Sequence, residues 1–204
     1  MESSTKELEL KAKEVIKAKF NAITKIDHES MHALLNLFSV KTYKKNEIII
    51  EENEEMTDFF FIFKGIIRIY FYKNERIVIE RFEKEGGFFG GSYEHLSKYP
   101  GVHIIQALED LVVLKMKHKE LELLFKKHHA VETLYRMLLE AFHYNYVDKL
   151  YALKSSSSEE RYADFMKEYG DIMNRISLKN VASYLSMTSE TISRIRSRYD
   201  KRVK

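Results

Sequence analysis

The sequence predicts an α+β protein with an antiparallel β roll, then a long helix, then an all-α unit at the C-terminus. Three observations predict this order. Glycine and proline are concentrated in the middle of the chain, helical apolar spacing flanks that region, and a serine run at 155–158 precedes a second helical pattern. With 204 residues, 45% of them hydrophobic, the chain has enough apolar material for one large domain and a small second unit.

Turn-forming residues mark the middle of the chain as β structure. Six of the seven glycines and the single proline lie between residues 65 and 101, and glycine supplies tight turns and bulges. Short runs of β-branched and aromatic residues lie at 48–50, 59–63, 66–72, 77–79 and 111–116. The tripeptide Lys73-Asn74-Glu75 is predicted to form a hairpin turn between two of these runs. Strands this short and closely spaced predict a small roll or barrel.

Helical spacing dominates both ends of the chain. Residues 5–21 and 27–38 carry apolar side chains at helical intervals. A longer stripe predicts a helix of about 25 residues; its members are Val131, Leu134, Leu138, Phe142, Tyr146, Leu150 and Leu153. Packing on the roll explains part of this stripe. Its length favours pairing with a second copy, so the stripe from Val131 to Leu150 is predicted to form the dimer contact.

The serine run at 155–158 is predicted to be a hinge that leads into another helix. Ser156 and Ser157 each stand three residues before a glutamate, at Glu159 and Glu160. This is the spacing of a capping box. A helix at about 159–169, ending near Gly170, follows from it.

Residues 177–196 have the apolar spacing of a helix-turn-helix. Ser177 is predicted to cap a first helix and Thr188 a second, with the turn at 186–187. The inward positions are predicted to be Leu178, Val181, Ala182, Leu185, Met187, Ile192 and Ile195. Two-helix corners of other kinds fit parts of this pattern.

The opposite face of the second helix is polar and suits DNA. In a major groove, glutamate accepts from cytosine N4 and arginine binds guanine O6 and N7. The predicted base-reading residues are Ser189, Glu190, Ser193 and Arg194. The predicted phosphate contacts, which position the helix, are Thr188, Thr191, Arg196, Arg198, Lys201 and Arg202. The alternative is a solvated face with an ion pair between Glu190 and Arg194, but six Lys or Arg against two acids from residue 189 onward favour DNA.

The order of these parts resembles the CRP/FNR family of transcription regulators, over roughly residues 28–198. The segment Glu190-Thr191-Ile192-Ser193-Arg194 is similar to the recognition-helix core of the FNR branch, and Glu159-Glu160-Arg161-Tyr162 also resembles family members. The resemblance implies a cyclic-nucleotide-binding-like jelly roll and a homodimer. It also implies a TTGA- or TGTGA-like palindrome, in which Glu190 and Arg194 read a G·C-containing half-site and Ser193 helps set the preference.

Several positions depart from the family. Gly65 and residues 86–90 fit its glycines, but Gly91 stands where cyclic-nucleotide binders have the ribose glutamate, and Gly101-Val102 where they have the phosphate-binding Arg-Ser/Thr pair. Without the arginine a buried phosphate is not neutralised, so cyclic AMP or GMP binding is not expected. The candidate pocket for an unknown small-molecule effector is Gly90, Gly91, Ser92, Tyr93, Val102 and His103. Ser186 replaces the glycine usual at the helix-turn-helix corner.

No cofactor or metal is predicted. The chain has no cysteine, which excludes disulfides, cysteine-held zinc and the iron–sulfur sensor of the FNR branch. Haem is not excluded in the same way, because the chain has eight histidines. They have no tight spacing, however, and are predicted to lie at surface or hinge positions; they include His95, His103, His118, His128 and His129.

Four segments are predicted: an N-terminal helical segment (1–26), the β-roll sensor domain (27–118), connecting and dimerisation helices (119–154) and the DNA-binding domain (155–204). The expected partners are a palindromic operator in double-stranded DNA, a second copy of the chain, RNA polymerase and the effector. There is no signal peptide and no apolar run of the roughly 18 residues that a span requires, so a cytoplasmic protein without membrane contact is expected.

Two other functions are considered. A cupin-like metal or small-molecule site would use a His-x-His pair, which is missing; Glu94-His95 and His103 are the closest approximation, and residues 88–101 are predicted as loop and short helix. A protein-interaction scaffold is the second alternative. No catalytic motif is found, so the protein is not expected to be an enzyme.

Overall fold

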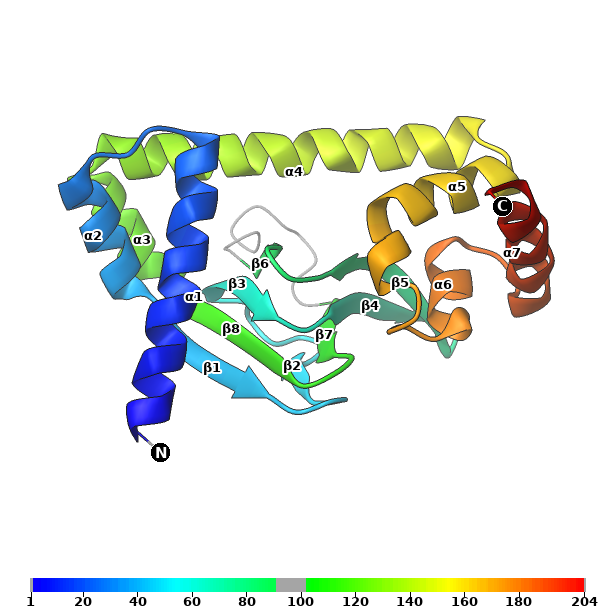
Figure 1. The fold of residues 1–204 in the computed structure, drawn as a ribbon, viewed down its shortest axis with the longest axis horizontal. Coiled ribbons are helices and arrows are strands. Elements are labelled where there is room, and N and C mark those ends of the chain that lie inside the picture. Colours follow the sequence, from blue (N-terminus) through cyan, green and yellow to red (C-terminus); the bar gives the residue numbers. More distant parts are fainter. Residues whose placement is uncertain (1, 91–101, 204) are drawn as a thin grey trace. The chain divides into compact units, whose positions relative to one another are not determined.

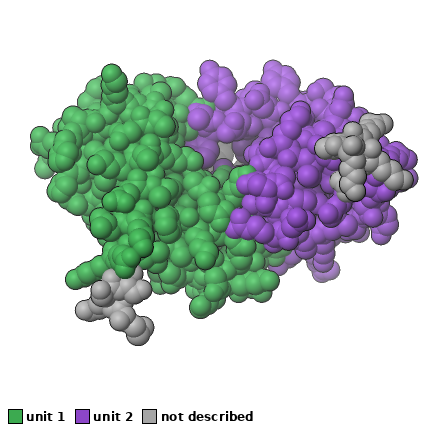
Figure 2. Space-filling view, in the orientation of Figure 1, with its two compact units in different colours: residues 1–69, 82–140 green, residues 70–81, 141–204 purple. Residues whose placement is uncertain are grey.

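The computed structural model describes residues 2–90 and 102–203, and side chains within residues 5–90 and 102–199. The chain forms two compact units, one of residues 1–69 and 82–140 and the other of residues 70–81 and 141–204 (Figure 2). The α-helices and strands, labelled in Figure 1, are α1 (Glu2–Ile23), α2 (His28–Leu37), β1 (Ser39–Tyr43), β2 (Ile48–Ile50), β3 (Asp58–Lys64), β4 (Ile67–Lys73), β5 (Arg76–Glu83), β6 (Phe88–Gly90), β7 (Ile104–Ala107), β8 (Leu111–Lys117), α3 (His118–Phe125), α4 (His129–Ser155), α5 (Ser158–Tyr169), α6 (Leu178–Tyr184) and α7 (Ser189–Val203). A 3₁₀ turn, η1 (Gly170–Ile172), lies between α5 and α6.

The strands form two four-stranded sheets, in the orders β1-β8-β3-β6 and β2-β7-β4-β5. In the first sheet every pair is antiparallel, with Val40 opposite Leu114 and Phe61 opposite both Leu114 and Phe88. Strands β2 and β7 pair antiparallel in the second. The predicted α+β class with an antiparallel roll is confirmed.

The core of the roll lies between the sheets and is rich in aromatic and branched residues. Phe60 and Phe89 stack with ring centroids 4.5 Å apart. They belong to a buried cluster with Ile50, Ile62, Ile67, Ile69, Ile105, Ala107, Leu111 and Val113. Because side chains alternate along a strand, Phe59 and Phe61 point away from this cluster, to the other face of the first sheet.

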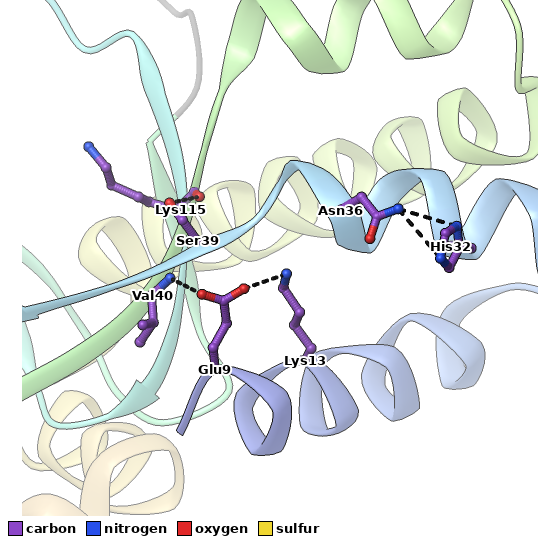
Figure 3. A network of polar contacts seen from close by, with 7 residues as sticks. All are labelled: Glu9, Lys13, His32, Asn36, Ser39, Val40 and Lys115. Atoms are coloured by element: carbon purple, nitrogen blue, oxygen red, sulfur yellow. Dashed lines mark hydrogen bonds and ion pairs between the residues drawn. The ribbon is translucent and has the colours of Figure 1, made fainter. Parts of the chain in front are cut away.

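Helices cover that other face of the first sheet. Phe20 of α1 stacks on Phe88 with centroids 5.9 Å apart, and Tyr135 of α4 meets Phe59 edge-on at 6.1 Å. The Glu9 carboxylate accepts from the Val40 N–H at 3.4 Å and pairs with Lys13 at 2.6 Å (Figure 3). Helix α1 is therefore fixed to β1 by a polar contact in addition to its buried side chains.

The predicted turn between β4 and β5 is confirmed. Asn74 and Glu75 both have positive φ, 49° and 61°, as a two-residue type I′ hairpin requires. The expectation of loop or helix over 88–101 is wrong at its start, because Phe88–Gly90 is strand β6; residues 91–101 lie outside the described part. Strands β1 and β7 are not among the predicted runs, because neither Ser39–Tyr43 nor Ile104–Ala107 contains three consecutive β-branched or aromatic residues.

The long helix is present, as α4, but its predicted stripe is divided. Val131, Leu134 and Leu138 are buried within the chain itself. Phe142 is half-buried, whereas Tyr146 and Leu150 are 61% and 50% exposed. The expectation of a partner contact at the first three positions is therefore corrected, because their own unit already covers them.

Candidate nucleic-acid interface

The C-terminal unit begins with a capped helix. The Ser157 hydroxyl accepts from the Glu160 N–H at 3.2 Å, and the Glu160 carboxylate accepts from the Ser157 N–H at 2.7 Å. This is the predicted capping box, and it starts α5. Helix α5 then buries Tyr162, Phe165 and Tyr169.

Helices α6 and α7 form the predicted pair joined by a tight turn. Ser177 caps α6 by accepting from the Asn180 N–H at 3.2 Å, and Thr188 caps α7 by accepting from the Thr191 N–H at 3.2 Å. Between them Ser186 has a φ of 55°, the left-handed region in which a non-glycine side chain is strained. The Met187 N–H returns to the Ala182 carbonyl at 2.9 Å and closes the turn.

The inward side of this pair is apolar, as the spacing predicts. Five of the predicted positions are 4% exposed or less, namely Val181, Ala182, Leu185, Ile192 and Ile195. Burial of these residues fixes the angle between α6 and α7 and determines which side of α7 faces outward.

The polar residues of α7 lie on that outward side. Ser189, Glu190, Ser193 and Arg194 are all exposed. They line one open hollow of about 670 Å³ together with Ser197 and Arg198. Sequence reasoning missed Ser197, although its position one helical turn beyond Ser193 is a usable signal. Short hydroxyl side chains around a carboxylate and a guanidinium leave room for an approaching base edge.

The described part of α7 carries charges of both signs, and its Arg198 is paired with a carboxylate. Hydrogen bonds from its own backbone N–H and from the Thr188 hydroxyl lower the pKa of Glu190 below its ordinary value of 4.5. Arg198 lies 3.4 Å from Glu159 of α5, so this predicted phosphate contact has a carboxylate partner when DNA is absent. Arg196 is half-buried.

The other predicted phosphate contacts lie at both ends of α7. Thr188 is exposed and its hydroxyl is 3.1 Å from that of Thr191. The side chains of Lys201 and Arg202 lie outside the described residues.

The predicted effector positions are described only in part. Gly90 has a φ of 91°, and a Cβ there would lie 2.2 Å from the Asp58 carbonyl oxygen; its role is therefore the close β3–β6 pairing. Val102 is 42% exposed and His103 is half-buried. Gly91, Ser92 and Tyr93 lie outside the described residues.

Among the histidines that the structure describes, His118 differs from expectation. His118 is buried, with Nε2 3.0 Å from the Tyr135 hydroxyl and Nδ1 3.2 Å from Glu122. Its predicted surface or hinge placement is wrong, because the start of α3 packs under α4. In residues 2–90 and 102–203, no three His, Asp or Glu side chains are grouped as metal ligands, and no helix is long and apolar enough to span a bilayer.

Comparison with known proteins finds one family model and several solved structures that are similar to this chain. Residues 40–128 match the model of the cyclic nucleotide-binding domain. No curated protein matches the chain at a significant level. Among solved structures, FixK2 from Bradyrhizobium japonicum is 23% identical, with a TM-score of 0.67 over 81% of this chain and 85% of that chain.

Two further structures are similar along most of the chain. A protein from Eubacterium rectale, assigned to the CRP/FNR family of transcriptional regulators, is 16% identical with a TM-score of 0.66, over 87% of this chain and 85% of that chain. A cyclic nucleotide-binding domain containing protein from Listeria monocytogenes is 20% identical with a TM-score of 0.64, over 93% and 90%. Residues 40–128 of this chain thus match the cyclic nucleotide-binding domain model, and the chain shares its fold with FixK2 and with the CRP/FNR regulator from Eubacterium rectale.

Proposed function

We propose that this protein is a transcription regulator that binds a palindromic operator in double-stranded DNA as a homodimer. One observation carries the proposal. Glu190 and Arg194 stand exposed on one side of α7, while Ile192 and Ile195 anchor its other side in the helix-turn-helix core. Such a helix enters the major groove with its N-terminal residues against the base edges.

The base-reading roles follow from chemistry. Arg194 offers two parallel N–H donors to guanine O6 and N7, and Glu190 accepts from cytosine N4. Ser189 and Ser193 are short enough to let the helix backbone approach. Thr188, Thr191, Arg196, Arg198, Lys201 and Arg202 are proposed to bind phosphates on either side.

The dimer is proposed to form through α4 between Leu139 and Leu153. Leu139, Tyr146 and Leu153 are exposed and recur every seven residues, the spacing of a coiled-coil seam. Pairing of two copies along this seam would set the separation of the two recognition helices. To bind two half-sites one turn of DNA apart, the two recognition helices must be separated by roughly 34 Å.

The roll is proposed as the sensor part of the regulator, without cyclic AMP as its ligand. An unidentified small molecule near residues 86–104 would act by changing the pairing of the α4 helices. RNA polymerase is the further partner, and a cytoplasmic location follows from the proposed role in transcription.

Selection of random duplex DNA against the purified full chain tests this proposal. We expect an enriched palindrome containing G·C pairs, lost with Arg194→Ala. Arg136→Ala, an exposed arginine of α4 that pairs with Glu140, is the matched control and is expected to select the same palindrome. Selection without enrichment, repeated with cell extract to supply an effector, would reject the DNA-binding function.

A further inference from the structure

Strand β5 ends the second sheet, and its outer edge receives a side chain instead of a strand. Among residues 2–90 and 102–203, the order β2-β7-β4-β5 gives the N–H and C=O groups on one side of β5 no strand neighbour. Unpaired groups on an edge strand are costly when shielded from water. Ile79 is only 3% exposed, so its N–H needs a partner from elsewhere.

Ser183 of α6 supplies that partner. Its hydroxyl donates to the Ile77 carbonyl at 2.8 Å and accepts from the Ile79 N–H at 3.0 Å. Residues two apart in a strand direct their backbone groups to the same side, and a hydroxyl both donates and accepts. One atom therefore does what a neighbouring strand residue would do, across more than 100 residues of sequence.

Neighbouring contacts hold the same helix from a second side. The Lys149 ammonium of α4 lies 5.7 Å from the ring centroid of Tyr169 and 5.8 Å from that of Tyr184, next to Ser183 in the chain. Lys149 is also 3.3 Å from Glu168. Helix α6 is thus held between the β4–β5 hairpin and the C-terminal half of α4.

These contacts do not cover the outward side of α7. Glu190 and Arg194 are exposed in the same structure in which Ser183 binds β5. We propose that Ser183 is a positioning residue for DNA recognition. Its hydroxyl holds α6 on the edge of β5, and the buried α6–α7 core passes that fixed orientation to the recognition helix. The inference rests on the proposed DNA-binding function.

Ser183→Ala in the full chain tests the inference. Alanine favours helix, so α6 is retained while the hydroxyl is lost. We expect hydrogen exchange of the peptide that contains Ile79 to become about tenfold faster, and operator affinity to fall by about tenfold. Ser183→Thr, which keeps a hydroxyl, is expected to restore both. Ser158→Ala is the matched control, because its hydroxyl makes no hydrogen bond within the described residues.

Binding is measured well below the unfolding temperature of each variant, where loss of stability alone leaves the affinity unchanged. Faster exchange at Ile79 with unchanged or tighter operator binding would overturn the positioning role while the DNA-binding function stands. Unchanged exchange would show that the Ser183 bonds do not protect Ile79 and would overturn it as well. A wild-type protein that binds no operator, with or without cell extract, would reject both proposals.

Discussion

Glu190 is kept ionised by groups at the start of its own helix. Its backbone N–H and the Thr188 hydroxyl both stabilise the carboxylate and lower its pKa below 4.5. A lowered pKa means that the charged form is retained as the pH falls, until the pH passes the folded-state pKa. The residue that is proposed to read cytosine therefore carries its charge throughout the physiological range.

The corresponding prediction concerns the pH dependence of base preference. Between pH 7 and pH 5 we expect the preference for cytosine opposite Glu190 to stay constant, because the carboxylate remains ionised. Competition titrations with operators changed at that base pair measure it. Glu190→Gln should lose the preference at both pH values. A wild-type preference that declines between pH 7 and pH 5 would contradict the lowered pKa.

Ser186 occupies a backbone conformation that suits glycine. With φ at 55°, the serine side chain is strained by about 1 kcal/mol. Glycine would remove this strain, but glycine loses more conformational freedom on folding, which offsets part of the gain. We expect Ser186→Gly to raise the free energy of unfolding in urea by about 0.5 kcal/mol. Ser197→Gly, inside α7, is the control and should lower it by about 0.5 kcal/mol. If both changes lower the free energy of unfolding, Ser186 is not strained in this turn.

The two halves of helix α4 differ in how far their apolar side chains are buried. The first half buries Val131 and Leu134 within the chain, whereas Tyr146 and Leu153 are exposed in the second. The apolar period of this helix is continuous, so its division arises from what surrounds each half.

Two tyrosines of α4 give a matched test of dimer formation. Tyr146 lies on the proposed seam, and Tyr144, 69% exposed, is about 200° away around the helix. We expect Tyr146→Glu to convert the dimer to a monomer in analytical ultracentrifugation, because a charge at the seam is desolvated. Tyr144→Glu should remain dimeric. Equal dimerisation of both variants would place the interface elsewhere.

The start of α5 depends on its capping box. Loss of the Ser157 hydroxyl leaves the Glu160 N–H unpaired, so we expect Ser157→Ala to lower the free energy of unfolding by about 1 kcal/mol. The pKa of Glu160 is lowered mainly by its bond from the Ser157 N–H. Its contribution is therefore full above pH 4.5 and lost as the pH falls through the folded-state pKa. Urea unfolding of the wild type and Ser157→Ala at pH 7 measures the contribution of the hydroxyl. The difference between the wild type and Glu160→Gln, followed as the pH falls below 4.5, measures that of the carboxylate, and a difference that grows as the pH falls would contradict the reciprocal cap.

The affinity of the proposed dimer for DNA should depend steeply on salt concentration. Each neutralised phosphate contributes a slope of about −0.9 in a log–log plot of affinity against salt. We expect Arg196→Ala, which removes one contact in each subunit, to reduce the slope by about 1.8 and to leave the selected sequence unchanged. Binding titrations from 50 to roughly 200 mM salt measure it. An altered base preference would instead make Arg196 a base-reading residue.

The sequence alone predicts those parts of the fold that local rules govern. Helix starts are predicted by Ser157, Ser177 and Thr188, because each capping hydrogen bond joins residues only three apart in the chain. The positions of Ile192 and Ile195 follow from helical periodicity, and with them the outward face of α7. The hairpin at Asn74-Glu75 follows from turn chemistry between two apolar runs.

The tertiary structure decides what depends on residues distant in sequence. Sequence periodicity shows that α4 is amphipathic but not that Val131 is covered by the chain itself and Tyr146 is not. Burial of His118 depends on Tyr135 in the following helix. The hydrogen bonds of Ser183 to β5 could not be predicted from the sequence, because no local pattern around a serine in a helix indicates which distant strand edge it will contact. Local hydrogen bonds are encoded within a few residues, whereas burial and edge pairing exist only once the chain has folded.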